Sequence, residues 1–99
     1  MAKMKTHFFD MGYPVLIGEF GANQRLAIGK DALHDASVKD YYKAVVTSAI
    51  NNGCVPVAWD TNSGLLSMTI FNRANTTVSN SNILESIQEA VKTASWPAK

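Results

Sequence analysis

Cysteine is scarce in this chain, and so are long hydrophobic runs and any excess of charge of one sign. Cys54 is the only cysteine among 99 residues, so the chain can form no internal disulfide, and it offers no repeated Cys/His spacing for a metal site. Because Cys54 begins an apolar stretch, we expect a small buried residue and not a nucleophile. The apolar runs are far shorter than the roughly 20 residues that span a bilayer, which argues against a membrane segment.

The charges are few and nearly balanced. Nine basic residues stand against eight acidic residues, and the formal net charge is +1. The basic residues are scattered, without the clustered face that phosphate binding requires, so we expect no nucleic-acid partner. With 46% hydrophobic and 17% charged residues, the composition is that of an ordinary globular segment. The opening Met-Ala-Lys-Met-Lys lacks the apolar centre of a secretion signal.

One carboxylate lies in strongly apolar surroundings. The run Pro14-Val-Leu-Ile-Gly-Glu-Phe-Gly-Ala22 places Glu19 at the exit of a short apolar strand and follows it closely with glycine. A carboxylate in such company is costly unless it is paired or needed for chemistry. The alternative to a functional role is that Glu19 simply reaches solvent at the end of the strand or forms a structural ion pair.

The spacing of apolar residues predicts the order helix, strand, helix, strand, helix. Gly12 and Gly53 are placed to end the first and second helices. The expected elements are a helix over 4–11, a strand from residue 14, a polar loop over 21–36, a helix over about 38–52, a strand over 54–59 and a final helix. The run 54–59 is typical of a strand buried on both faces, although Pro56 suggests an edge or an irregular start.

Two capping signals predict where the later helices begin. Ser37 precedes Asp40 by three residues, and Asn82 precedes Glu85 by three residues. Four residues at helical spacing follow the second signal, and we interpret them as a core stripe: Ile83, Leu84, Ile87 and Val91.

Two of these strands resemble a known enzyme family. The residues Val-Leu-Ile-Gly-Glu-Phe-Gly resemble the seventh strand of glycoside hydrolase family 5, the cellulase and endoglucanase family, in which the glutamate after Ile-Gly is the catalytic nucleophile. Glu19 matches that position. The run Val55-Pro-Val-Ala-Trp-Asp-Thr-Asn62 resembles the eighth strand, whose tryptophan lines the sugar site, and Trp59 matches that residue. Phe71-Asn72-Arg73 resembles the end of the following loop.

The resemblance implies a fold larger than this chain. The family has an eight-stranded β/α barrel, which needs about 250 residues. Residues 1–99 are therefore expected to be a single C-terminal segment of a glycoside hydrolase catalytic barrel: an α/β fold, a partial (β/α)8 TIM barrel of order α-β-α-β-α with two parallel strands. Two such strands leave sheet edges uncovered, so we expect a homo-oligomer that completes the barrel.

The activity that the resemblance implies is that of a retaining endo-β-1,4-glucanase acting on β-glucan or cellulose oligosaccharides, with no cofactor and no metal. Retaining hydrolysis needs two carboxyl groups roughly 5 Å apart. The family's acid/base follows an asparagine, and the chain contains no Asn-Glu dipeptide. His7, on the opening helix, and His34, in the loop before the next helix, match no family position. We therefore expect weak or no activity alone unless copies assemble.

Other residues near the strand ends are weaker candidates. In the barrel, the loop after the first strand leaves the catalytic end, which makes Asn23, Gln24 and Arg25 candidate sugar contacts. Asp60 is a candidate for the second acid, but strand alternation turns it away from Trp59, and an acid there more often caps a turn or pairs with a nearby base.

Both tryptophans have a packing interpretation. Trp59 either stacks on sugar or packs, and Trp96, which precedes Pro97, is expected to anchor the C-terminal end against the body. The alternative function is a noncatalytic, self-assembling carbohydrate-binding or structural α/β module in which Glu19 is incidental. The resemblance implies a secreted parent enzyme and leaves the location of this segment open.

Overall fold

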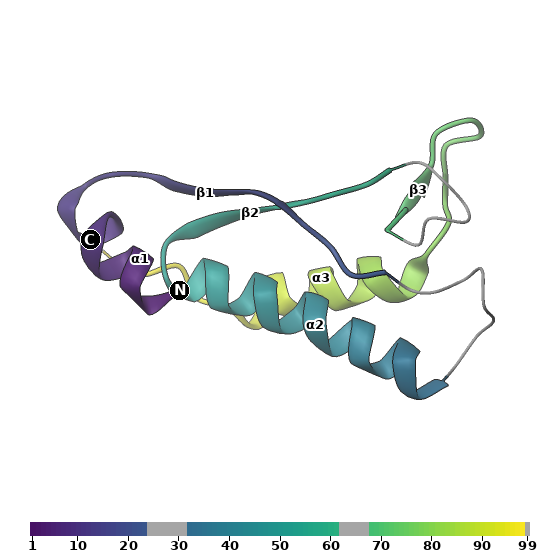
Figure 1. The fold of residues 1–99 in the computed structure, drawn as a ribbon, viewed down its shortest axis with the longest axis horizontal. Helices are drawn as coiled ribbons and strands as arrows, with labels where there is room; N and C mark the ends of the chain where they lie inside the picture. The colour runs from purple at the N-terminus through teal and green to yellow at the C-terminus, as the bar shows by residue number, and fades with distance from the viewer. Residues whose placement is uncertain (24–31, 62–67, 99) are drawn as a thin grey trace.

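Two parallel strands lie over two long helices (Figure 1). The computed structural model describes residues 1–23, 32–61 and 68–98. Strand β1 is Val15–Phe20 and strand β2 is Cys54–Ala58, while helix α2 is Ala32–Asn51 and helix α3 is Ser81–Thr93. The termini lie at one end of the molecule, beside the start of the strands, and the carboxyl ends of the strands point to the other end. The predicted parallel pairing is confirmed.

The N-terminal segment is not the single helix predicted over 4–11. Helix α1 covers Ala2–His7, and a 3-10 helix, η1, covers Phe9–Met11. Between them Phe8 leaves the helical conformation, with φ −127° and ψ −58°. This turn brings the buried ring of Phe9 against Trp96, with 5.6 Å between ring centroids. Gly12 ends the segment at φ 90°, as expected.

Helix α2 begins earlier than the capping signal predicted. It is already helical at Ala32, so the predicted polar loop over 21–36 is wrong for its last residues, and His34 lies in the helix and not in a loop. Ser37 lies inside the helix, where its hydroxyl donates to the carbonyl of Leu33 at 3.1 Å. A serine can satisfy its hydroxyl in this way without starting a helix. Gly53, at φ 72°, follows the helix as predicted.

The two strands pair in register except for one irregularity near the end of β1. Ile17 pairs with Pro56, and Phe20 pairs with Ala58. Gly18 and Glu19 therefore stand opposite the single residue Val57, which is a β-bulge. A bulge re-aims the side chains that follow it, and here it lets Glu19 be exposed while the next residue, Phe20, packs on the core.

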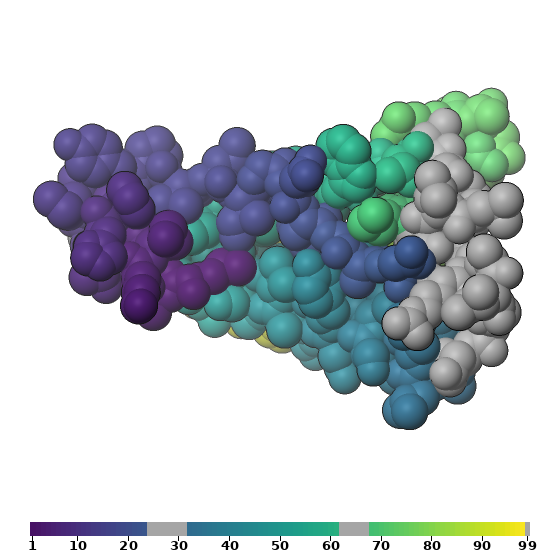
Figure 2. Space-filling model, viewed as in Figure 1, coloured from purple at the N-terminus to yellow at the C-terminus, as the bar shows by residue number. Residues whose placement is uncertain are grey.

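The sheet has one covered face and one open face. The covered face packs on α2 and α3 through Phe20, Cys54 and Ala58. We call the face that carries Leu16, Val55, Val57 and Trp59 the open face. The exposed fractions of these four residues are 65%, 47%, 41% and 47%. The prediction that the second strand is buried on both faces is therefore wrong within this chain. Figure 2 shows the residues of β1 at the surface above α2, with no helix in front of them.

A short hairpin follows β2 that the spacing did not predict. Strands β3, Phe71–Asn72, and β4, Thr77–Val78, pair in antiparallel fashion beyond the carboxyl ends of β1 and β2. The order predicted from the sequence, α-β-α-β-α, thus omits this hairpin. Pro56 lies in a strand whose partner among the described residues is β1 alone, in agreement with the edge position that proline favours.

Helix α3 packs on α2 and begins after Asn80, not at the predicted cap Asn82. The predicted apolar stripe is partly right. Ile83 is fully buried, but Val91 is 56% exposed. Ser86 and Ala90, which follow Ile83 by three and seven residues, are the residues of α3 buried with it. Val91 follows Ile83 by eight residues and is rotated about 80° from it around the helix axis, at the border of the buried stripe.

The core lies between the helices, the covered face and the segment before β3. Its buried residues are Val38, Tyr42, Ile70 and Ile83. Helix α2 contributes Val38, Tyr42, Val46 and Ala49 to the buried residues, a spacing of three or four residues that places them on one face of the helix. In the part of the chain that the structure describes, no helix combines the length and the apolar character that crossing a membrane requires.

Candidate active site

Glu19 lies at the carboxyl end of β1, on an exposed stretch of the strand. The bulge at Gly18 and Glu19 places both residues outside the core. Without the bulge, strict alternation would put Glu19 on the same side as Ile17, toward the helices. The bulge therefore explains how a strand of apolar residues presents a carboxylate away from the core.

Trp59 follows β2 at the same end of the sheet. Its backbone N–H donates to the carbonyl of Phe20 at 2.8 Å, so it lies beside the residue that comes after Glu19. Alternation along β2 puts Trp59 on the open face with Val55 and Val57. Neighbouring strands lie about 4.8 Å apart. The carboxylate of Glu19 and the exposed indole of Trp59 therefore belong to the carboxyl ends of adjacent strands.

The loop after β1 is fixed at its start by two contacts. The N–H of Ala22 donates to the Tyr42 hydroxyl at 3.2 Å, and the carbonyl of Asn23 lies 2.8 Å from Nε2 of His34. Asn23 itself is exposed just beyond Glu19 and Phe20. The candidate sugar contacts Gln24 and Arg25 lie outside the described residues.

Tyr42 of helix α2 contacts the end of β1 and the residues that follow it, a role that was not predicted from the sequence. It is fully buried, and its ring lies 5.7 Å from that of Phe20. Burial raises the pKa of Tyr42 above the usual 10.0, although the hydrogen bond from Ala22 opposes this shift. A tyrosine at a core position of a helix needs a polar partner for its hydroxyl, and this need was the signal available in the sequence.

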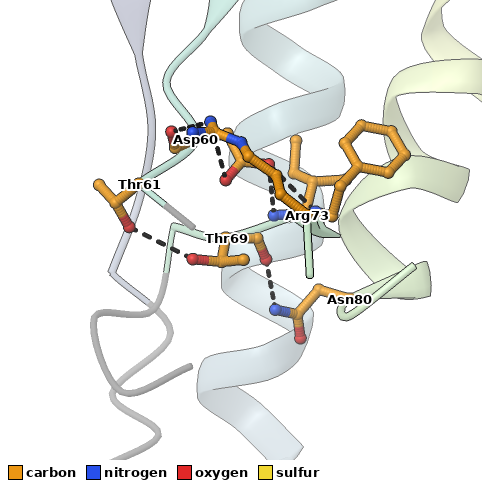
Figure 3. Close-up of polar contacts among 7 residues, drawn as sticks. Asp60, Thr61, Thr69, Arg73 and Asn80 are labelled. Atoms are coloured by element: carbon orange, nitrogen blue, oxygen red, sulfur yellow. Dashed lines mark hydrogen bonds and ion pairs between the residues drawn. The ribbon is translucent and has the colours of Figure 1, made fainter. Parts of the chain in front are cut away.

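Asp60 joins the end of β2 to the segment that leads into the hairpin (Figure 3). Its Oδ2 accepts the backbone N–H groups of Ile70 at 3.1 Å and of Phe71 at 3.0 Å. Arg73 donates from Nη2 to the Asp60 carbonyl at 2.9 Å and lies 3.8 Å from its Oδ1. The side chain of Asp60 is only 14% exposed. The expectation that Asp60 pairs with a nearby base is confirmed by Arg73. The alternative, a local turn cap, is not what its carboxylate forms, because the two N–H groups it accepts lie ten and eleven residues further along the chain.

The remaining candidate residues lie far from the carboxyl end of the sheet or pack against other side chains. His7 ends helix α1, at the opposite end of the molecule. Cys54 is fully buried, as predicted, and Trp96 packs edge-on against Phe9, as expected of a residue that anchors the C-terminal segment. Within residues 1–23, 32–61 and 68–98, no group of three or more His, Cys, Asp or Glu side chains is placed to hold a metal ion.

Among the described residues, Glu19 and Trp59 supply a carboxylate and an aromatic platform at this end of the sheet. Aromatic faces pack on the C–H surfaces of sugars, and a carboxylate can attack an anomeric carbon. Retaining glycoside hydrolysis requires a second carboxyl group roughly 5 Å away. Asp60 does not fit that role, because its carboxylate is committed to backbone N–H groups behind the sheet edge.

Comparison with solved structures defines the class of protein to which this arrangement corresponds. A xyloglucan-specific beta-1,4-glucanase of glycoside hydrolase family 5 from a ruminal metagenomic library is 42% identical, with a TM-score of 0.87 over 95% of this chain and 26% of that chain. A family 5 xyloglucanase from Paenibacillus pabuli is 36% identical, with a TM-score of 0.78 over 88% of this chain and 24% of that chain. The chain thus has a partial TIM-barrel fold.

A curated endoglucanase is also similar to this chain. Endoglucanase A from Paenibacillus barcinonensis is 34% identical over 90 residues, which are 90% of this chain and 22% of that protein. No protein-family model matches the chain. The chain spans about a quarter of the length of the relatives it matches. The resemblance to glycoside hydrolase family 5 is confirmed, and the match is consistent with the C-terminal segment of its barrel.

Proposed function

We propose that residues 1–99 form one segment of the catalytic barrel of a retaining endo-β-1,4-glucanase and that Glu19 is its nucleophile. The observation that carries the proposal is the β-bulge in β1, which exposes Glu19 at the carboxyl end of the sheet beside Trp59. Active sites of β/α barrels lie at this end. The relatives named above include an endoglucanase and two xyloglucanases, which makes a β-1,4-linked glucan backbone the proposed substrate.

In this proposal Trp59 binds substrate and Asn23 is a second contact. The Trp59 indole is 47% exposed on the open face, so a sugar ring has access to it. Asn23 is exposed where the chain leaves the catalytic edge. The carboxylate of Glu19 would attack the anomeric carbon while a separate acid protonates the leaving oxygen.

In this proposal the separate acid comes from outside the single folded chain. The sequence contains no Asn-Glu dipeptide at which the family's acid/base would lie. The apolar open face is the surface that other barrel strands would cover, and self-association through it is the simplest way for copies of this chain to build a closed site. Activity therefore depends on assembly, and the isolated monomer is weakly active or inactive. The parent enzyme, by analogy with its relatives, is secreted.

The second candidate function is a noncatalytic, self-assembling module that binds carbohydrate or serves only as structure. It rests on the same open face, where Trp59 can stack on a sugar without help from Glu19. The glucanase function requires the Glu19 carboxylate, whereas the noncatalytic module does not.

The deciding experiment measures hydrolysis of soluble xyloglucan and of a soluble β-1,4-glucan over a range of protein concentrations, with the mass of the assembly recorded at each point. The unaltered 99-residue chain is compared with the Glu19→Gln variant. Specific activity that rises as the protein assembles, and that the substitution abolishes, is the expected result. Glu19 is exposed and outside the core, so the variant should keep its fold.

Two results would count against the proposal. Activity that survives in Glu19→Gln would remove Glu19 from the role of nucleophile. Absence of hydrolysis at every concentration, together with oligosaccharide binding that Glu19→Gln leaves unchanged, would establish the noncatalytic module.

A further inference from the structure

The carboxylate of Asp60 is the central contact between the sheet edge and the hairpin. It accepts two consecutive backbone N–H groups, those of Ile70 and Phe71, and it is almost enclosed. Hydrogen bonds to an ionised acceptor are about twice as strong as those between neutral groups. Asp60 is also the residue that directly follows Trp59, so whatever holds Asp60 also restrains the backbone at Trp59.

The hairpin depends on such attachments for its position. Strands β3 and β4 have two residues each, and a two-stranded hairpin is at best marginally stable alone. Other contacts lie close to Asp60. Ser79 donates its N–H to the Ile70 carbonyl at 2.8 Å. The hydroxyls of Thr61 and Thr69 lie 3.2 Å apart (Figure 3). Ile70 is itself a core residue. The Asp60 contact thus ties the strand end to the core.

We infer that Asp60 is a positioning residue of the candidate sugar site, which acts by holding Trp59 and the hairpin at the carboxyl end of the sheet. This inference rests on the proposed function in one respect, namely that Trp59 is a sugar platform. With Asp60 tethered behind the edge, alternation keeps the neighbouring Trp59 on the open face. Without the tether, Ile70 and Phe71 lose the acceptor for their N–H groups and the edge rearranges.

The test uses tryptophan fluorescence, because the chain has only two tryptophans. Trp96→Phe leaves Trp59 as the single reporter and keeps an aromatic ring against Phe9. In this background Asp60→Asn is compared with Asp40→Asn, which makes the same chemical change at an exposed position of α2. The readouts are Trp59 emission, quenching by acrylamide, and titration with xyloglucan oligosaccharide, with far-ultraviolet circular dichroism to follow the fold.

Asp60→Asn should shift Trp59 emission, change its quenching and weaken oligosaccharide binding roughly tenfold, whereas Asp40→Asn should change none of the three. Emission and quenching identical in the two variants would overturn the inference. If Asp60→Asn alters the fluorescence but the Trp96→Phe parent binds no oligosaccharide, the substrate-binding role of Trp59 fails and its positioning by Asp60 stands.

A measurement on the unaltered chain tests the inference even if the Asp60→Asn variant does not fold. Phe71 is an exposed residue whose N–H donates to Asp60, so its amide proton should exchange with solvent much more slowly than those of freely exposed amides. Exchange of the Phe71 amide at the rate of a free amide would overturn the inference independently of any substitution.

Discussion

The backbone N–H of Trp59 donates a 2.8 Å hydrogen bond to the carbonyl of Phe20, the residue that follows Glu19. This bond closes the ladder between β1 and β2 after the bulge and brings the two candidate site residues to one edge. It ties the position of the indole to the same backbone that presents the carboxylate. A site of this kind depends on the register of the strands as well as on the residues that they carry.

Alanine should destabilise the protein at Gly53 but have little effect at Gly18. Gly53 has φ 72°, and a Cβ there would collide with the ring of Phe9, so Gly53→Ala should lower the free energy of unfolding by about 1–3 kcal/mol. A Cβ at Gly18 meets no atom within 4 Å, so Gly18→Ala should change it by less than about 0.5 kcal/mol. Urea unfolding of both variants makes the comparison; equal effects would contradict it.

The hydroxyl of Tyr42 should contribute measurably to stability. Tyr42→Phe removes the acceptor for the Ala22 N–H and should cost about 1 kcal/mol in the free energy of unfolding. Tyr41→Phe is the matched control, since Tyr41 is partly exposed on the same helix. A cost at Tyr41 equal to that at Tyr42 would argue against the buried hydrogen bond.

The same tyrosine should make the protein sensitive to alkali. Burial raises the pKa of Tyr42 in the folded state, so above the ordinary value of 10.0 the unfolded chain loses this proton while the folded chain keeps it. The stability linked to Tyr42 is therefore fully present below pH 10.0 and is lost as the pH rises through the folded pKa. Unfolding followed from pH 9 to 11, as rough limits around that value, should show a shallower decline in Tyr42→Phe than in Tyr41→Phe.

Charge on the open face should prevent self-association. Val57→Lys places an ammonium group in the exposed apolar surface, where burial against another copy would require its desolvation. Light scattering should report a smaller mass than for the parent chain at equal concentration. Val91→Lys is the control, because Val91 is an exposed valine on α3. An equal loss of mass in both variants would point to a general effect of charge.

The rings of Phe9 and Trp96 should be energetically coupled. They meet edge to face at 86° with 5.6 Å between centroids, a geometry worth about 0.5–1.5 kcal/mol beyond area burial. A double-mutant cycle with Phe9→Leu and Trp96→Leu should give a coupling energy of that order. The control cycle of Phe9→Leu with Trp59→Leu should give a value near zero, because β2 separates the two residues by roughly 20 Å.

Much of the site was predictable from local pattern. The motif around Glu19 and the tryptophan that ends the next strand identified the family, and the comparisons confirm it. The expectation that Asp60 pairs with a nearby base is met by Arg73, whereas its bonds to Ile70 and Phe71 were not predicted. The roles of Glu19, Trp59 and Asn23 in catalysis and binding stay predictions.

The sequence alone determined the helix α2 and the glycine ends at Gly12 and Gly53, because these depend on residues near one another in the chain. The parallel pairing of β1 with β2 joins segments distant in sequence, and it was expected from the resemblance to a barrel family. The tertiary structure decided the bulge at Glu19, the short hairpin and the exposure of the open face. A bulge exists only relative to its partner strand, which here is distant in sequence. The hairpin is local, but its two-residue strands carry too few residues to be recognised from a pattern. Burial of a face likewise depends on what lies against it, and here the helices cover one side of the sheet only.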